Sequence, residues 1–245
     1  MKTILKATGI KKSFGDKGVL DDINITLGEG ELVSILGTSG VGKTTLFDII
    51  SGLTLPDEGR VILGGRDVTG RTGMVAYMQQ KDLLLEHKTV LDNTALPLII
   101  SGVKKKAARD MAADFFPQFG LSGTENKYPA QLSGGMRQRA AFLRTYLSHC
   151  TVALLDEPFS ALDMHTKRAM EEWYLGVMDE IKMSTLFITH DADEAVLISD
   201  RIYTMSGSPA HLGAEITISE PRPRNSEFML SDAFLAHKRE ITANI

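Results

Sequence analysis

The segment GTSGVGKTT, residues 37–45, constrains the fold of this chain more than any other. It matches the pattern G-x-x-x-x-G-K-[ST], in which glycines let backbone N–H groups converge on phosphate oxygens. The apolar stretch ELVSILG precedes it and TTLFDIISG follows, so we expect a strand, the loop, and a helix beginning near Lys43. That helix would direct its positive dipole end toward phosphate. A chance match is expected in about one chain in a hundred of this length, so the segment predicts nucleotide binding.

The residues of this loop have separate expected roles. Lys43 should reach the β and γ phosphates of the nucleotide, and the Thr44 hydroxyl should bind Mg²⁺. The remaining loop residues should cradle the phosphate groups. They are Gly37, Thr38, Ser39, Gly40, Val41, Gly42 and Thr45.

A second motif, VALLDEP, places two acids at the end of an apolar stretch. Asp156 is expected to join the Mg²⁺ shell, as an acid after a strand commonly does in NTPases with this loop. Glu157 comes next and points elsewhere, and a carboxylate beside the γ-phosphate can polarise an attacking water. The alternative is a surface acidic pair that closes a strand. Taken alone, the motif fits the surface pair and the catalytic pair equally well. The phosphate loop in the same chain favours the catalytic interpretation.

Three expected strands, LVSIL, VALLD and TLFIT, are nearly all apolar. Continuous apolar runs are typical of strands covered on both faces in a parallel sheet. Each run ends on a polar motif, at Gly37, at Asp156 and Glu157, and at His190. Ligands of open α/β sheets bind beyond the carboxyl ends of the strands. The fold class is therefore α/β with a mostly parallel core sheet, and the three motifs should meet in one crevice.

The alternation of strands and helices is interrupted in the middle of the chain. Helical patterns dominate from about Val90 to Leu147, with breaks at proline and glycine. We interpret this stretch as a helical subdomain, about 90–147, inserted into a single domain that spans 1–245. The first sixty or so residues instead read as short strands punctuated by Gly and Asp.

Composition excludes several classes of function. A net charge of −4 and a pI near 5.9 argue against a protein-wide basic field for nucleic acid. The single cysteine, Cys150, excludes an internal disulfide and fits a reducing cytosol. The N-terminal sequence lacks a signal-peptide pattern, and no apolar run approaches the ~20 residues that span a bilayer. We expect a soluble protein that works at a membrane only through a partner.

Further motifs give the chain a family resemblance. In order, they are YMQQKDLLLEHKTV, LSGGMRQR, SALD and FITHD. With the phosphate loop and the acidic pair, they make nearly all 245 residues resemble the ATP-binding subunit of an ABC transporter. The resemblance implies a P-loop NTPase fold of the ABC cassette type, with an N-terminal antiparallel β subdomain and an inserted helical subdomain. It also implies that ATP and Mg²⁺ bind and that ATP is hydrolysed to ADP and phosphate.

The same resemblance assigns roles to single residues. Phe14, in KKSFG, matches the aromatic that stacks on adenine; the alternative is a core phenylalanine. Two adjacent glutamines compete for the contact with Mg²⁺ and water, and the spacing to TVLDN favours Gln80 over Gln79. His190, in FITHD, matches the switch histidine that faces the γ-phosphate together with Lys43.

The segment LSGGMRQR matches the signature of the family, which pairs two copies head to tail. The signature of one copy closes on the γ-phosphate held by Lys43 of the other. Asp163, in SALD, matches the loop at the seam between the copies. The family usually has Gln where this chain has Met136, so a polar side-chain contact is in doubt at that position. The residues expected to bind in this way are Ser133, Gly134 and Gly135.

The resemblance also implies partners at the membrane. In transporters of this type the helical insert and the glutamine loop meet membrane permease subunits, and the contact groove is expected to include LLLEHKTV. Glu86 and His87 stand where close relatives often have Pro-Trp. The protein is therefore expected at the cytoplasmic face of the membrane, linked indirectly to a substrate-binding protein. The basic segment GVKKKAARD is interpreted as a solvated face in preference to a lipid contact.

The cargo class is expected from four segments. KDLLLEHKTVLDNTALPL, the signature, FITHDADEAVLISDRIYTMSGSP and EPRPR resemble the importer group for nitrate, sulfonates, taurine and thiamine-precursor pyrimidines. The helix EEWYLGVMDEI favours the last of these, and a C-terminal regulatory domain is not expected. The alternative functions are an ABC-type ATPase of DNA repair or chromosome maintenance and a non-transport ATP sensor. Only residues 46–131 separate the loop from the signature, too few for very long coiled coils, and Glu157 and His190 argue for catalysis.

Overall fold

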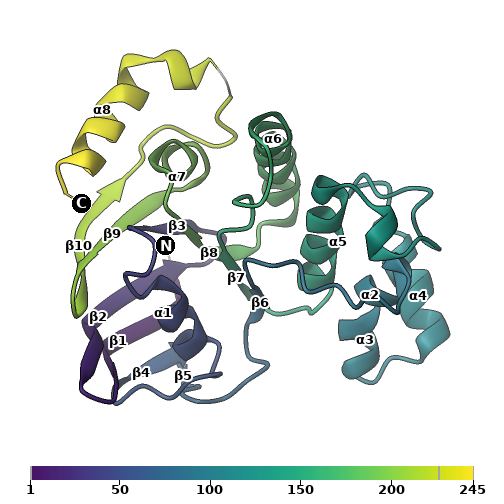
Figure 1. The fold of residues 1–245 in the computed structure, drawn as a ribbon, viewed down its shortest axis with the longest axis horizontal. Helices are drawn as coiled ribbons and strands as arrows, with labels where there is room; N and C mark the ends of the chain where they lie inside the picture. Colours follow the sequence, from purple (N-terminus) through teal and green to yellow (C-terminus); the bar gives the residue numbers. More distant parts are fainter. Residues whose placement is uncertain (1, 226, 245) are drawn as a thin grey trace.

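The computed structural model describes residues 2–225 and 227–244, and it contains a 10-stranded sheet. The strand order is β5-β4-β1-β2-β10-β9-β3-β8-β7-β6. One half of this sheet is parallel and the other is antiparallel, and a group of helices lies beside the β6 edge (Figure 1).

Parallel pairing joins five neighbouring strands at the core of the molecule. All residues of the three apolar strands in this group are buried, as their sequences predict. In β7, Val152 and Leu154 pack in the cluster that includes α1, whereas Ala153 and Leu155 pack in the cluster that includes α6. The bounds are β3 Leu32–Leu36, β6 Ala76–Met78, β7 Val152–Asp156, β8 Ser184–Thr189 and β9 Arg201–Gly207.

The antiparallel half comes mostly from the N-terminal part of the chain. Strand β1 pairs with β2 on one side and with β4 on the other, and β5 closes the edge. Strand β10 pairs antiparallel with β9 and joins this half to the parallel half through β2. The bounds are β1 Thr3–Phe14, β2 Lys17–Gly28, β4 Glu58–Leu63, β5 Arg66–Asp67 and β10 Ala210–Thr217.

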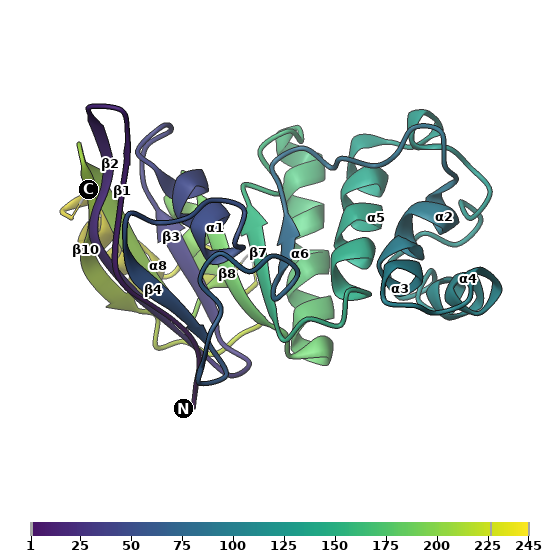
Figure 2. The ribbon, with the colours of Figure 1, turned by 90° about the horizontal axis from the view of Figure 1, so that it is seen from below.

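Four α-helices occupy the stretch expected to be a helical insert, and they form a lobe beside the sheet (Figure 2). They are α2 (Val90–Thr94), α3 (Leu96–Ile100), α4 (Lys105–Ala113) and α5 (Gly134–Tyr146), with a 3-10 turn η1 at Pro129–Gln131. The other helices belong to the sheet half of the molecule. They are α1 (Lys43–Ile50), α6 (Met164–Ile181), α7 (Ala192–Ile198) and α8 (Asp232–Thr242), with a 3-10 turn η2 at Phe228–Leu230.

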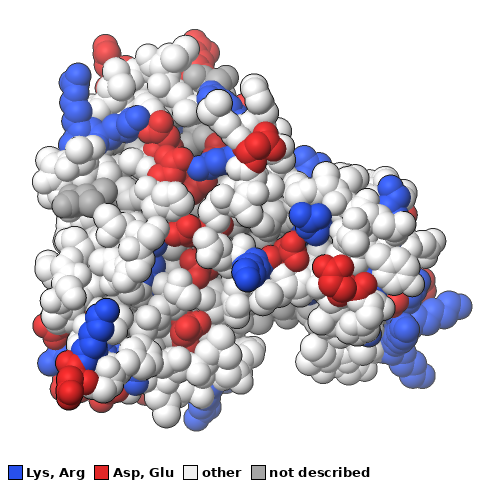
Figure 3. Space-filling view, viewed as in Figure 1, with Lys and Arg blue, Asp and Glu red and all other residues white. Residues whose placement is uncertain are grey.

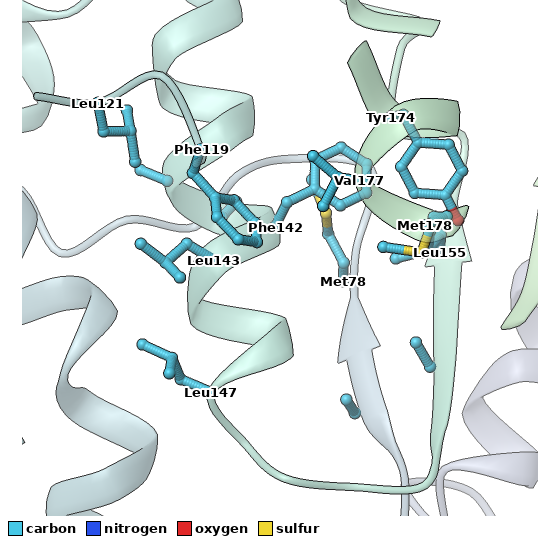
Figure 4. Close-up of a cluster of buried hydrophobic side chains, with 14 of the residues drawn as sticks. Met78, Phe119, Leu121, Phe142, Leu143, Leu147, Leu155, Tyr174, Val177 and Met178 are labelled. Carbon is cyan, nitrogen blue, oxygen red and sulfur yellow. The ribbon is translucent and has the colours of Figure 1, made fainter. Parts of the chain in front are cut away.

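An aromatic cluster attaches the helical lobe to the core (Figure 4). Phe142 on α5 lies 5.2 Å, between ring centroids, from Tyr174 on α6. The Phe159 ring lies 5.9 Å from that of Tyr174 and 5.8 Å from that of Phe187 on β8. Each such pair contributes about 0.5–1.5 kcal/mol beyond the burial of its area. This packing fixes the direction of α5, and hence of the segment at its N-terminus, relative to the sheet.

The predicted fold class is confirmed. Near the C-terminus the chain forms two short helical segments. The structure has the turn η2 and then α8, separated at Ser231, whose hydroxyl accepts a hydrogen bond from the Phe234 N–H at 3.2 Å and caps α8. Across the described residues, no helix is both long and apolar enough to cross a membrane.

Candidate active site

The phosphate loop connects β3 to α1, and two of its glycines are required by sterics. A Cβ atom at Gly37 would lie 2.4 Å from the carbonyl oxygen of Met205 on β9. Gly42 has a φ of +120°, and a Cβ there would lie 3.0 Å from Leu20 Cδ2. Larger residues at these positions would displace the backbone that carries the N–H groups of the loop. The glycine pattern in the sequence thus has a direct geometric cause.

The loop wraps around the amine of Lys43, whose side chain is only 4% exposed. Lys43 Nζ donates hydrogen bonds to the carbonyl oxygens of Gly37 at 2.7 Å and Thr38 at 3.0 Å. It also lies 3.7 Å from Glu157 Oε1. Burial lowers the pKa of the Lys43 amine below its ordinary value. A buried ammonium in this position is a strong local source of positive charge for an anionic ligand.

Two oxygen ligands stand together at the start of α1. The Thr44 hydroxyl donates a hydrogen bond of 2.9 Å to Asp156 Oδ2, and the Tyr77 hydroxyl lies 3.4 Å from the same oxygen. Burial raises the pKa of the Asp156 carboxyl above its ordinary value. A hydroxyl beside a buried carboxylate is the kind of oxygen donor set that Mg²⁺ takes at nucleotide sites. The pair therefore fits a hard divalent cation.

Glu157 is the meeting point of the separate motifs. Its φ of +44° is uncommon for a residue with a side chain, and its N–H donates to the Ile188 carbonyl at 3.0 Å. One carboxylate oxygen, Oε2, lies 3.0 Å from His190 Nδ1 and 3.4 Å from Gln80 Nε2. The other oxygen faces Lys43. Strained backbone of this kind persists where the surrounding structure holds it, commonly at functional sites.

Lys43, Thr44, Asp156 and Glu157 open onto a cavity of about 380 Å³, whereas His190 lines a neighbouring pocket that shares Gln80 and Glu157 with it. Phe14 stands at its rim with 55% of its surface exposed, so the alternative of a core phenylalanine is wrong. Gln80 lines the cavity, whereas Gln79 lines an adjoining pocket on the side of Asp48 and Leu53. The lining residues are Phe14, Val19, Ser39, Gly40, Gly42, Lys43, Thr44, Thr45, Gln80, Asp156 and Glu157.

The signature residues lie outside this cavity, on a second surface. Ser133 is the N-cap of α5 and accepts a hydrogen bond from the Met136 N–H at 3.3 Å. A Cβ at Gly134 would lie 3.3 Å from Leu162 Cδ2, so the signature is adjacent to the SALD loop. Asp163 ends that loop as the N-cap of α6. Gly135 is buried against α6, where a Cβ would lie 3.1 Å from Thr166 Cγ2.

Two contributors were missed by the sequence reasoning. Tyr77 lies between the carboxyls of Asp48 and Asp156, and burial raises its pKa, so it keeps its proton and can donate. Arg144 on α5 donates to the carbonyl oxygens of Asp82 at 2.5 Å and Leu83 at 2.7 Å, which ties the glutamine loop to the signature helix. The only signal for Tyr77 was its place before the glutamines. Nothing in the local pattern distinguished Arg144 from the other arginines of α5.

Comparisons with known proteins agree with this geometry. The sequence profile of the family described as ABC transporter matches residues 20–160. The formylaminopyrimidine import ATP-binding protein ThiZ of Halalkalibacterium halodurans is 44% identical over 209 residues, covering 85% of this chain and 82% of ThiZ. The sulfate/thiosulfate import ATP-binding protein CysA 2 of Rhizobium meliloti is 38% identical over 82% of this chain, which spans 57% of that protein.

A solved structure agrees as well. The ATP-binding cassette MJ0796, in a dimeric post-hydrolysis state bound to ADP and Pi, superposes with a TM-score of 0.75. It is 27% identical, and the match covers 89% of this chain and all of that one. The phosphate loop, the acidic pair and the signature thus occur together in a chain that matches the family over most of its length. The chain belongs to the ABC transporter family, as one of its ATP-binding, ATP-hydrolysing subunits.

Proposed function

We propose that this chain hydrolyses ATP at sites shared between two copies of itself and thereby powers a membrane importer for a small nutrient. The observation that carries the proposal is the convergence on one carboxylate, Glu157, of groups from three other motifs. Lys43, Gln80 and His190 all lie within 4 Å of it, at 3.7, 3.4 and 3.0 Å. An accidental acidic pair at the end of a strand has no reason to gather an amine, an amide and an imidazole.

In this proposal the cavity holds the nucleotide from base to γ-phosphate. The exposed Phe14 ring stacks on adenine, and the loop of residues 37–45 binds the phosphates. Thr44, Asp156 and Gln80 would hold Mg²⁺, which would supply positive charge to offset that of the phosphates. Lys43 exchanges its bonds to the loop carbonyls for bonds to phosphate oxygens. It then offsets the negative charge of the reacting group.

Glu157 is proposed to orient the attacking water and to accept its proton. Its carboxylate lies 3.7 Å from the amine of Lys43, the residue proposed to contact the γ-phosphate. His190, with 51% of its side chain exposed, would turn one ring nitrogen to Glu157 and present the other to the γ-phosphate. Phosphoryl transfer needs little covalent chemistry from the protein, so this catalysis consists of positioning and charge compensation.

The second copy would supply what the cavity of one chain lacks. Ser133, Gly134 and Asp163 lie at a separate surface, and Gly135 is buried behind it against α6. Met164, next to Asp163, is 79% exposed and is therefore accessible to a partner at this surface. A head-to-tail pair would place this surface over the phosphates bound by the other chain. ATP would then stabilise the pair, and hydrolysis would release it.

A permease would dock in a groove between the helical lobe and the sheet. The groove has a volume of about 550 Å³, and Figure 3 shows the molecule hollowed between the two lobes. Its apolar lining includes the exposed side chains of Leu83 and Ile100, at 50% and 77% exposure, and Pro97. Leu83 comes three residues after Gln80. A displacement of Leu83 by a docked permease would therefore be transmitted to Gln80 through a short segment. Docking there places the protein at the cytoplasmic face of the membrane.

The cargo is proposed to be a thiamine-precursor pyrimidine, with nitrate, a sulfonate or taurine as less favoured members of the same importer group. The support is the identity to ThiZ, which is named for formylaminopyrimidine import. The test is the ATPase of the chain reconstituted with its permease and binding protein in liposomes. Formylaminopyrimidine should stimulate hydrolysis and enter the vesicles, whereas sulfate, nitrate and taurine should not. Stimulation by sulfate, nitrate or taurine, without stimulation by formylaminopyrimidine, would overturn the cargo assignment.

A further inference from the structure

One lysine on α6 lies among three acids behind the active site. Lys167 Nζ lies 2.7 Å from Asp191 Oδ2, 3.2 Å from Glu194 Oε1 and 3.7 Å from Glu171 Oε1. Two of these acids are nearly inaccessible, with side-chain exposures of 4% for Glu194 and 9% for Glu171. In the described part of the chain, no other Lys or Arg forms an ion pair with any of the three acids.

The charges of this cluster depend on each other. Burial alone would lower the pKa of Lys167, but the surrounding carboxylates raise it above its ordinary value. Burial and the neighbouring Glu194 carboxyl raise the pKa of Glu171 to about 7. Lys167 is therefore held as a cation. The closest of the three carboxylates to its amine is that of the partly exposed Asp191.

Asp191 fixes the backbone that carries His190. Its carboxylate accepts hydrogen bonds from the N–H groups of Asp193 at 2.9 Å and Glu194 at 3.4 Å, which caps α7. Its own N–H donates to the Thr189 hydroxyl at 2.9 Å. The ring of His190 itself has one described polar contact, with Glu157. The direction of the ring is thus set by the backbone on either side of it, and the anchor on the C-terminal side is Asp191.

Lys167 is also linked through the backbone of α6 to Asp163, at the surface that is proposed to meet the second copy. Lys167 lies one helical turn beyond Asp163, and its N–H donates to the Asp163 carbonyl at 2.8 Å. Asp163 begins α6 and ends the SALD loop. A displacement of the first turn of α6 therefore moves Lys167, and the 2.7 Å ion pair carries that movement to Asp191.

We propose that Lys167 is a positioning residue for hydrolysis: it clamps Asp191 to the first turn of α6, holds His190 at Glu157, and couples that placement to the SALD loop. The inference rests on the proposed role of His190 at the γ-phosphate. It assigns to Lys167 no contact with ATP. The clamp makes the position of His190 depend on whether the surface around Asp163 is engaged.

The test compares variants of the full chain in steady-state hydrolysis of MgATP and in binding of a fluorescent ATP analogue. Lys167→Met keeps an unbranched side chain that is one heavy atom shorter and removes its charge. It should lower kcat by about tenfold or more while the affinity for the analogue changes by less than about twofold. Lys167→Arg, which can restore the pair with Asp191, should recover most of kcat. Lys238→Met is the matched control, because Lys238 on α8 pairs at 2.5 Å with Asp193 on α7, the helix that Asp191 caps, and no ion pair joins Lys238 to Asp191 among the described residues.

A second variant separates positioning from simple charge neutralisation. Lys167→Met leaves buried acids without a cation, so it also lowers the melting temperature. Adding Glu171→Gln removes one of those charges and should recover melting temperature without recovering kcat. Recovery of kcat in this double variant, or an equal loss of kcat in Lys238→Met, would overturn the clamp.

His190→Ala separates the inference from the function on which it rests. Loss of kcat in His190→Ala together with normal kcat in Lys167→Met would overturn the clamp and leave the proposed function intact. Normal kcat in both variants would contradict the proposed role of His190, and the clamp with it.

Discussion

His190 Nδ1 lies 3.0 Å from Glu157 Oε2, although 33 positions separate the two residues in the chain. The register of the sheet causes this proximity. Strands β7 and β8 pair in parallel with Asp156 opposite Ile188, so the residues that follow each strand emerge at the same edge. The Glu157 N–H then continues the pairing to the Ile188 carbonyl at 3.0 Å. Two motifs that are distant in sequence are thus held together by backbone hydrogen bonds, independently of any ligand.

Removal of the Phe14 ring should weaken nucleotide binding without unfolding the protein. The ring is 55% exposed, so Phe14→Ala costs little packing. Loss of stacking on adenine should raise the Kd for ATP by about 5- to 150-fold, corresponding to roughly 1–3 kcal/mol. Binding of a fluorescent ATP analogue measures the effect, with Phe14→Trp expected to retain affinity. Leu53→Ala is the matched control, because Leu53 is 56% exposed and does not line the nucleotide cavity. Equal affinities of wild type and Phe14→Ala would refute the stacking role.

A methyl group at Gly42 should damage the phosphate loop. The backbone has a φ of +120°, and the added Cβ would meet Leu20 Cδ2 at 3.0 Å. Gly42→Ala should therefore raise the Kd for ATP more than about tenfold and destabilise the fold by about 1–3 kcal/mol. Gly176→Ala is the control, since a Cβ there meets no atom within 4 Å and should stabilise α6 by about 0.5–1 kcal/mol. Calorimetric melting and ATP titration check both expectations, and a Gly42→Ala variant that binds ATP normally would be inconsistent with the loop geometry.

The parts of the site that the sequence predicted are those encoded locally. Apolar strands that end on polar motifs predicted where Gly37, Asp156 and His190 would lie, because parallel strands bring their carboxyl ends to one edge. The spacing to TVLDN also favours Gln80, whose side-chain amide lies 3.4 Å from Glu157 Oε2 in the structure. Its role, like the roles of the other site residues, stays a prediction for the experiments described above.

The parts that could not be predicted depend on packing between distant elements. Lys167, Glu171 and Asp191 come from two helices, and no motif in either segment indicates that they share one buried cluster. The hydrogen bond from Arg144 to the Leu83 carbonyl oxygen depends on the orientation of α5 relative to the glutamine loop. Aromatic packing between α5, α6 and the sheet fixes that orientation. The aromatic residues involved follow no regular spacing in the sequence that would indicate this packing.

Glu171 should make stability depend on pH near neutrality. Its folded-state pKa of about 7 lies above the ordinary value of 4.5, so the folded state binds the proton more tightly than the unfolded chain. The stabilising contribution is complete below pH 4.5 and is lost as the pH rises through 7. Glu171→Gln mimics the protonated acid, so its advantage over wild type in free energy of unfolding should grow by roughly 2 kcal/mol between pH 5 and pH 8.

Urea unfolding at several pH values measures this difference. Glu172→Gln is the matched control, because Glu172 is exposed on the same helix, and its difference from wild type should stay flat. A flat difference for Glu171→Gln as well would show that the buried acid does not titrate in this range.

The central claim is that one copy of the chain holds ATP at Lys43 and Glu157 while the signature surface of a second copy closes over it. Light scattering of the Glu157→Gln variant with MgATP tests this most directly, in parallel with its rate of phosphate release. The account predicts an ATP-dependent species of twice the 26.8 kDa chain mass and almost no hydrolysis. Adding Ser133→Arg should return the protein to a monomer that still binds ATP. Undiminished hydrolysis by Glu157→Gln, or an ATP-dependent dimer that persists with Ser133→Arg, would contradict the account.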